Sequence, residues 1–339
     1  MKVVTFGEIM LRLQPEGYLR FVQAEKLTST FGGAEANVAV SLAHFGIDSY
    51  YVTKLPLNDI GDAALLHLRK YGVNTQFIAR GGERLGIYYN EKGASQRGSK
   101  CIYDRKNSSV STSVPLDYNW EEIFKGTDCY HITGITPSLS DSLEKICIDS
   151  CIAAKKMGIK ISVDLNYRSK LWSKEKARLV MSKVCSYADL IITNEEDAKN
   201  VFGIEAKSCD AENGLIIKKN YEDVASSLSK MFNDAKVAVT LRTSINANVN
   251  KWAALYYDAD KFFYSHEYEM FVVDRNGGGD AFAAALIYAL LNKYSSQDAV
   301  EFATAAGCLK HSIEGDMNLA SVEEVKNVCA GHSSGRINR

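Results

Sequence analysis

The 339-residue sequence lacks the marks of an exported, membrane-spanning or nucleic-acid-binding protein. Its first residues, MKVVTFGEIM, are too short and, at Glu8, too acidic for a signal peptide. The longest apolar run, Ala281–Leu291, is far below the ~20 residues that a membrane helix needs. The formal net charge is -1, so no global basic field attracts nucleic acid. We therefore expect a cytoplasmic protein with neither a membrane nor a nucleic-acid partner.

The sequence also lacks the motifs of several enzyme classes. Its eight cysteines form no C-x-x-C pair, which argues against a zinc ribbon or a thioredoxin-type site. There is no G-x-x-x-x-G-K-[ST] and no G-x-G-x-x-G, so neither a P-loop kinase nor a dinucleotide site is supported. The H-R-D and D-F-G motifs are missing as well, which excludes a protein kinase.

What the sequence does contain is a regular alternation of strand and helix patterns. The expected strands are Val3–Phe6, Tyr50–Leu55, Ile159–Leu165, Leu190–Thr193 and Val237–Leu241. The expected helices are Ala36–His44, Gly61–Lys70, Leu139–Met157 and Lys174–Ser186. Such an alternation predicts an α/β fold, with a mostly parallel sheet covered by helices on both faces.

Two stretches interrupt this alternation. Arg12–Thr30 has no helical period, and Gly86–Arg105 reads as the strands Gly86–Asn90 and Lys100–Asp104 around a polar turn. We expect a small β-sheet that is inserted in the body and covers a cleft; an ordinary surface hairpin is the alternative. A small sheet leaves an unpaired edge and an apolar face, which favours a homodimer through the lid or a higher homo-oligomer. The expected division is a body (1–11, 31–84 and 113–330), a lid (12–30 and 85–112) and a tail (331–339).

The segment with the clearest chemical meaning is a triple glycine followed by an acid. Gly277–Gly279 precede Asp280 and the apolar run that we expect to be a buried helix. Glycine amides at a helix N-terminus form an anion site. A carboxylate beside such a site can accept the proton of an attacking hydroxyl, as a kinase requires. Asp280 as a simple helix N-cap is the alternative.

Two signatures make the sequence resemble the ribokinase-like (pfkB) carbohydrate kinases. Asp274–Phe282 is similar to their C-terminal D-T-x-G-A-G-D-x-F, and Phe31–Ala39 is similar to their N-terminal signature, about 240 residues earlier. The resemblance implies a three-layer α/β sandwich with a β-lid. It implies Asp280 as catalytic base and an anion hole at Gly277, Gly278 and Gly279. Where the family has Ala, this chain has Gly278, a change that we expect only to loosen the loop.

The same resemblance implies the cofactors ATP and Mg²⁺. Asn194–Asp197 is similar to the family's N-x-x-E element, which organises Mg²⁺ and phosphates. Asp197 stands where Glu is usual, which makes Glu196 our candidate for the metal; a solvated helix N-terminus is the alternative. The candidate ATP-binding residues are Asn166, Asn194, Arg242, Gly277, Gly278 and Gly279.

Cationic and aromatic residues indicate the substrate. Arg105 lies in the inserted hairpin, and Arg168 follows a central strand at the end where α/β sheets bind ligands. Two converging arginines suit an anionic substrate, because guanidinium binds carboxylate bidentately, whereas a neutral sugar would leave them unpaired. A solvated Arg105 and a salt-bridged Arg168 are the alternatives.

These residues resemble those of the 2-keto-3-deoxygluconate kinases in the family. The resemblance implies transfer from ATP to the 6-hydroxyl of that sugar acid. The candidate substrate-binding residues are Gly33, Asn37, Tyr88, Tyr103, Arg105, Arg168 and Asp316. Other possible substrates are fructose, ribose, a nucleoside and 5-keto-2-deoxygluconate. A sugar-binding sensor without catalysis is a further alternative, against which the intact Asp280 argues.

Overall fold

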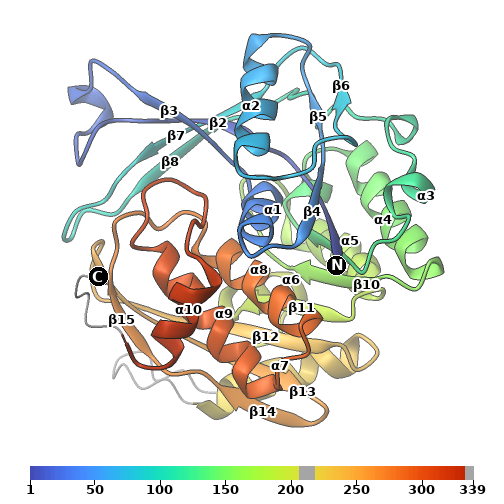
Figure 1. The fold of residues 1–339 in the computed structure, drawn as a ribbon, viewed down its shortest axis with the longest axis vertical. Helices are drawn as coiled ribbons and strands as arrows, with labels where there is room; N and C mark the ends of the chain where they lie inside the picture. The colour runs from blue at the N-terminus through green and yellow to red at the C-terminus, as the bar shows by residue number, and fades with distance from the viewer. Residues whose placement is uncertain (206–217, 333–339) are drawn as a thin grey trace.

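A computed structural model describes residues 1–205 and 218–332 of the chain, so most of the expected tail lies outside the described residues. Within these residues the central sheet has nine strands (Figure 1). Six neighbouring strands run parallel, namely β12, β11, β10, β9, β1 and β4. Strand β13 is antiparallel to β12 and pairs with both β14 and β15. In sheet order the strands are β14 (Lys261–Tyr264), β13 (Val249–Asp258), β12 (Lys236–Ser244), β11 (Leu190–Asn194), β10 (Lys160–Asp164), β9 (Cys129–Thr133), β1 (Lys2–Phe6) and β4 (Asp48–Val52), with β15 (Tyr268–Phe271) beside β13.

Helices cover both faces of the sheet, as the alternating pattern predicts. One face packs with α3 (Trp120–Ile123), α4 (Asp141–Lys156), α5 (Lys174–Cys185), α6 (Glu195–Phe202) and α7 (Lys218–Met231). The other face packs with α1 (Ala34–His44), α8 (Gly278–Leu291), α9 (Ser296–Lys310) and α10 (Val322–Cys329). Helix α8 is apolar on all sides because it is buried between α1, α9 and the sheet. The predicted three-layer α/β fold is therefore confirmed.

One expected strand is wrong in its extent. The apolar run Tyr50–Leu55 is broken at Thr53, so β4 ends at Val52 and a separate short strand, β5 (Lys54–Leu55), follows. Strand β5 pairs with β6 (Ala79–Arg80) in a two-stranded sheet, next to α2 (Asp59–Lys70). A continuous apolar run does not reveal where a chain leaves one sheet for another.

The lid is a four-stranded mixed sheet outside the central sheet, and it extends from one side of the body (Figure 1). Its order is β3 (Thr28–Gly32), β2 (Met10–Gln14), β7 (Gly86–Glu91) and β8 (Lys100–Asp104). The hairpin β7–β8 is the one that the sequence predicts, and β2 joins it in parallel. Strand β2 begins two residues before the expected lid segment 12–30, and strand β3 ends two residues after it. The short helices η1 (Phe21–Gln23), η2 (Pro115–Asp117) and η3 (Thr136–Ser138) complete the described elements.

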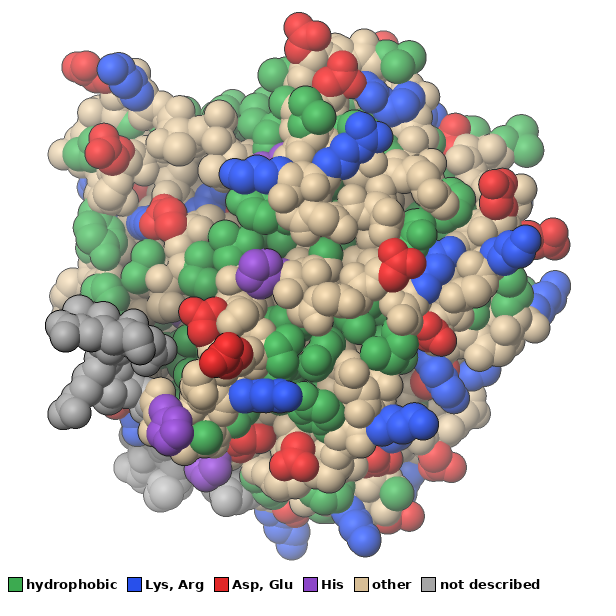
Figure 2. Space-filling view, in the orientation of Figure 1, with side chains coloured by type: hydrophobic (Ala, Val, Ile, Leu, Met, Phe, Trp, Pro, Cys, Tyr) green, Lys and Arg blue, Asp and Glu red, His purple; other side chains and the backbone are tan. Residues whose placement is uncertain are grey.

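The surface carries mixed charge. Figure 2 shows acidic and basic side chains interspersed on the visible face, in keeping with a formal net charge of -1. In the part of the chain that the structure describes, no helix is long and apolar enough to cross a membrane. The seven described cysteines are free thiols.

Candidate active site

A cleft of about 930 Å³ lies where the parallel strands end. Polar and charged residues reach the cleft from the carboxyl ends of β1, β10, β11 and β12. They are Glu8, Asp164, Thr193, Asn194, Thr240 and Arg242. The N-terminus of α8 lines the same cleft, and the lid contributes Tyr88 and Tyr103. Because parallel strands point their carboxyl ends in one direction, residues far apart in the sequence meet at this edge of the sheet.

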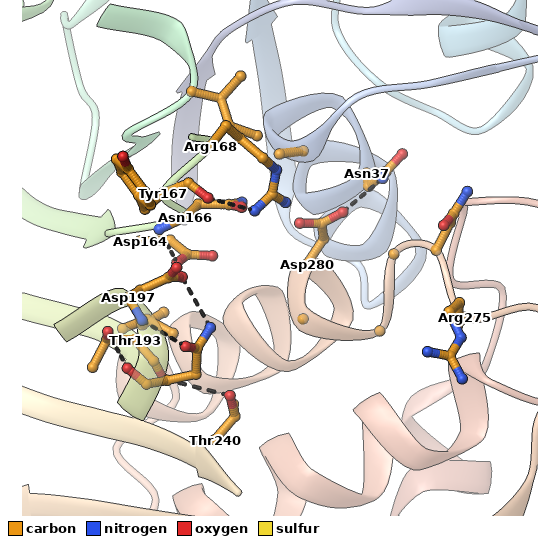
Figure 3. Close-up of a pocket in the computed structure, with 18 of the residues that line it drawn as sticks. Asn37, Asp164, Asn166, Tyr167, Arg168, Thr193, Asp197, Thr240, Arg275 and Asp280 are labelled. Atoms are coloured by element: carbon orange, nitrogen blue, oxygen red, sulfur yellow. Dashed lines mark hydrogen bonds between the residues drawn. The ribbon is translucent and has the colours of Figure 1, made fainter. Parts of the chain in front are cut away.

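Asp280 lies in the first turn of α8 and is partly buried. The Asn37 side chain donates a hydrogen bond of 2.7 Å to its Oδ2, which brings the two sequence signatures together (Figure 3). Burial raises the pKa of Asp280 to about 7, although the Asn37 bond opposes this shift. A carboxyl group with a pKa near 7 is well matched to proton abstraction at neutral pH.

The triple glycine has specific steric functions. Gly277 caps α8 in the left-handed conformation, with φ of 80°, and a Cβ there would lie 1.9 Å from the Asp316 carbonyl oxygen. A Cβ on Gly278 would lie 2.2 Å from Cε1 of the His311 ring, which is held by a 2.6 Å hydrogen bond between its Nδ1 and the Gly307 carbonyl. The expectation that Gly278 only loosens the loop is therefore wrong, because His311 occupies the space of an alanine methyl.

Two acids line the cleft, Asp164 at the end of β10 and Asp197 in the first turn of α6, which follows β11. Burial, together with the neighbouring Asp197 and Asp280 carboxylates, raises the pKa of Asp164. Burial also raises the pKa of Asp197 to about 6, against the opposing effect of Arg168. Asn194 caps α6, accepting from the Asp197 amide at 2.8 Å and donating to its carboxylate at 2.9 Å. Glu196 also lines the cleft but is exposed, so Asp197 is the more enclosed of the two acids.

The two arginines expected to meet the substrate have different surroundings. Arg105 is 10% exposed and is bound to Glu8, with a 2.7 Å hydrogen bond from Nε to Oε2. The expectation that a neutral sugar would leave Arg105 unpaired is therefore wrong. Arg168 donates to the Tyr167 carbonyl at 3.0 Å and has no carboxylate within ion-pair distance among the described residues. Figure 3 shows its guanidinium pointing toward Asp280.

Asp316 belongs to a buried ionic network that connects the lid with the body. Arg12, on lid strand β2, binds Asp316 and also Asp274, the latter at 2.5 Å. Arg12 is 1% exposed, and although burial alone would lower its pKa, the Asp316 and Asp274 carboxylates raise it. Asp316 still lines the cleft, so its carboxylate can face both Arg12 and a ligand.

All of the remaining predicted residues line this cleft: Gly33, Tyr88, Tyr103, Asn166, Asn194, Arg242 and Gly279. Tyr88 and Tyr103 stack with their ring centroids 6.0 Å apart, and Asn166 has a positive φ of 37°. The sequence reasoning did not select Glu8, Arg12, Asp164, Arg275 or Lys310. Glu8 and Asp164 could have been found from their place at strand ends, whereas Arg12 and Lys310 gave no such signal.

The fold and this cleft define a small-molecule kinase of the α/β class. Residues 1–322 match the model of the pfkB family of carbohydrate kinases. The chain belongs to that family and is a sugar kinase.

The chain is similar to several named kinases over most of its length. The solved structure of 2-dehydro-3-deoxygluconokinase from Thermotoga maritima is 47% identical, with a TM-score of 0.94 and 98% of each chain covered. The 2-dehydro-3-deoxygalactonokinase of Haloferax volcanii is 30% identical, again with 98% of each chain covered. The 2-dehydro-3-deoxygluconokinase of Bacillus subtilis is 26% identical over 94% of this chain and 92% of its own length.

Proposed function

We propose that this sugar kinase transfers the γ-phosphoryl group of ATP to the 6-hydroxyl of 2-keto-3-deoxygluconate, which is also called 2-dehydro-3-deoxygluconate. The observation that carries the proposal is Asp280, a partly buried carboxyl at the N-terminus of α8 with a pKa of about 7. The 47% identity to the Thermotoga maritima enzyme supports the choice of sugar acid.

In the proposed reaction Asp280 accepts the proton of the sugar hydroxyl as that oxygen attacks the γ-phosphorus. The backbone amides that begin α8 stabilise the charge on the transferred phosphoryl oxygens, because the helix N-terminus is electropositive. The Asn37 amide holds the Asp280 carboxylate in a single orientation. The lid over the cleft would exclude water that would otherwise hydrolyse ATP.

Arg168 is the residue that we assign to the substrate carboxylate. It lines the cleft, points toward Asp280 and has no ion-pair partner in the described part of the chain (Figure 3). Arg105 is already neutralised by Glu8, so we assign this pair jointly to the sugar. Both hydrogen bonds from Arg105 go to Oε2 of Glu8, and the buried Oε1 has no hydrogen-bond partner among the described residues. That free oxygen could accept a bond from a sugar hydroxyl.

The nucleotide would occupy the part of the cleft that β11 and β12 border. Arg275 and Arg242 both line the cleft, and burial followed by repulsion from Arg242 lowers the pKa of Arg275. Within the described residues neither guanidinium has a carboxylate within ion-pair distance, and two such neighbouring cations suit a polyphosphate. Asn194 and Thr240 add polar groups along the same edge.

The acids at this edge of the sheet suit a Mg²⁺ ion that would be bound by the protein and the nucleotide together. The described residues contain no preformed group of three or more ligating side chains. Mg²⁺ normally takes one or two carboxylates together with water and phosphate oxygens. Asp164 and Asp197 would supply the carboxylates, and the exposed Glu196 would act through water. When bound, the ion would neutralise charge on the phosphates.

A coupled assay of ADP release tests the proposed substrate. The panel contains 2-keto-3-deoxygluconate, its galactonate epimer, 5-keto-2-deoxygluconate, fructose and ribose, and ³¹P NMR of the product locates the phosphate. We expect the highest kcat/KM with 2-keto-3-deoxygluconate. A preference for the galactonate epimer would keep the class of substrate and change the sugar. Higher kcat/KM with fructose or ribose than with any sugar acid would refute the proposal.

A further inference from the structure

Lys310 is a lysine with no access to solvent. It is the last residue of α9, and its side chain is fully buried, with 0% exposure. Its Nζ donates to two backbone carbonyl oxygens, that of Asp274 at 3.3 Å and that of Ile313 at 3.2 Å. Within the described residues no carboxylate lies within 4.0 Å of this nitrogen, since the nearby Asp274 and Asp316 carboxylates pair with Arg12 instead. The ammonium group is therefore held by carbonyl dipoles.

The two carbonyls belong to two segments that together form the back of the phosphoryl site. One segment leads into Gly277, and the other, 311–316, ends at the Asp316 carbonyl against which Gly277 packs. Backbone hydrogen bonds join the segments, from the Val273 amide to the His311 carbonyl at 2.8 Å, for example. A Cβ on Gly277 would also lie 3.3 Å from Cε of Lys310, so the lysine stem lies directly against the glycine that caps α8.

A lysine in this position carries an electrostatic cost that packing alone does not explain. Removing an ammonium group from water costs several kcal/mol, unless polar groups replace the lost hydration. Burial lowers the pKa of Lys310, and the Asp274 and Asp316 carboxylates oppose that shift. A methionine would fill a similar volume at no such cost, but it would leave two buried carbonyl oxygens without a donor.

We propose that Lys310 is a built-in cation of the phosphoryl site: its ammonium binds the carbonyls of both segments, fixes Gly277–Gly279 for catalysis and makes added monovalent cations unnecessary. Lys310 is not among the described residues that line the cleft, so it is a positioning residue and touches no substrate. The proposal depends on the sugar kinase class of the protein and not on the identity of the sugar.

The wild-type enzyme gives the first test. Turnover is measured in tetramethylammonium salts, whose cation is larger than K⁺ and has no N–H group to donate to the two carbonyls, using the sugar with the highest activity. Adding K⁺ or NH₄⁺ should leave kcat unchanged. A severalfold activation by either ion would overturn the proposal. Because each measurement compares the enzyme with itself on one substrate, the result does not depend on whether that substrate is the proposed sugar acid.

Two variants give the second test. Lys310→Ala removes the ammonium and opens a cavity, and we expect a loss in kcat of roughly tenfold or more, because the anion-site amides lose their alignment. NH₄⁺ or methylammonium should restore much of that loss in a saturable way. Lys310→Met should show the same loss without rescue, since its thioether fills the cavity. Lys156→Ala is the matched control, because Lys156 also ends a helix, α4, but is exposed.

Two results with the variants would overturn the proposal. One is a Lys310→Ala enzyme as active as wild type. The other is a loss that none of the cations restores, which would make Lys310 a packing residue only. Thermal unfolding of each variant with and without NH₄⁺ shows whether the protein is folded. If neither variant folds, the wild-type salt series alone decides the question.

Discussion

Replacing Asp280 by Asn removes the proposed base while keeping the size of the side chain. General-base removal costs about 10²- to 10⁴-fold in rate. The amide oxygen of the variant can still accept the 2.7 Å hydrogen bond from Asn37, so the geometry of the site should survive. We therefore expect kcat to fall by at least about 10²-fold, with little change in sugar affinity.

The raised pKa of Asp280 adds a pH dependence with a definite sign. The base must be ionised, so wild-type kcat/KM should fall about tenfold per pH unit below about pH 7, where the carboxyl is protonated. ATP also titrates in this region, and the pH profile of the Asp280→Asn enzyme supplies the correction for it. The variant itself should show no dependence on this carboxyl.

The same shift predicts that the variant is more stable than wild type above neutral pH. The unfolded pKa of Asp is about 3.9 and the folded pKa of Asp280 is about 7, so ionisation in the folded state costs up to about 4 kcal/mol. That cost grows as the pH rises from about 3.9 to about 7, and it is absent only below about pH 3.9, where the carboxyl is protonated in both states. At about 0.7 kcal/mol/K of unfolding entropy for a chain of this length, Asp280→Asn should raise Tm by roughly 6 °C at pH 8. Near pH 4 the two proteins should unfold alike.

Steady-state kinetics between pH 5 and 8.5 and calorimetry between pH 4 and 8.5 check both expectations, with isothermal titration of the sugar to measure binding. A variant that keeps most of the wild-type kcat would show that Asp280 is not the base. A wild-type kcat/KM that stays flat below pH 7 after correction for ATP would refute the pKa argument, even if the variant were inactive.

Four further predictions concern the two arginines, the glycine loop and the lid. Arg168→Ala should lower kcat/KM for keto-deoxy sugar acids by about one to two decades and affect neutral sugars much less; an unchanged acid-to-neutral ratio would make Arg168 structural. Arg105→Ala should change that ratio less but should destabilise the fold by about 3–5 kcal/mol, measured by denaturant unfolding, because Glu8 loses its partner. Gly278→Ala should cost about 1–3 kcal/mol through its collision with His311, and adding His311→Ala should recover stability; a double variant no better than the single one would contradict this. If the lid pairs two subunits, Ile102→Lys on the 54% exposed side chain in β8 should convert dimers to monomers in sedimentation; a monomeric wild type would exclude that pairing.

The local sequence predicted much of the architecture. Helices and strands depend on the spacing of apolar residues, which can be read without knowing the partners. The helix that begins after Gly277–Gly279 is an example, because the glycines and the continuous apolar run together specify a buried helix with an open N-terminus. The hairpin β7–β8 is another, since two short strands around a polar turn pair locally.

The tertiary structure alone decided how charges are partnered. Arg12 and Arg105 have the sequence context of surface arginines, yet both are enclosed, because Asp316 and Glu8 reach them from positions far away in the chain. Lys310 ends a helix as many exposed lysines do, and only the packing of two distant segments turns it inward. Sequence by itself determined the order of strands and helices, the glycine-rich loop and the acid beside it, because these depend on neighbours in the chain. Which charges meet, and which of them stay free for a substrate, depends on contacts between residues up to 304 positions apart, and those exist only once the sheet has brought the strand ends together.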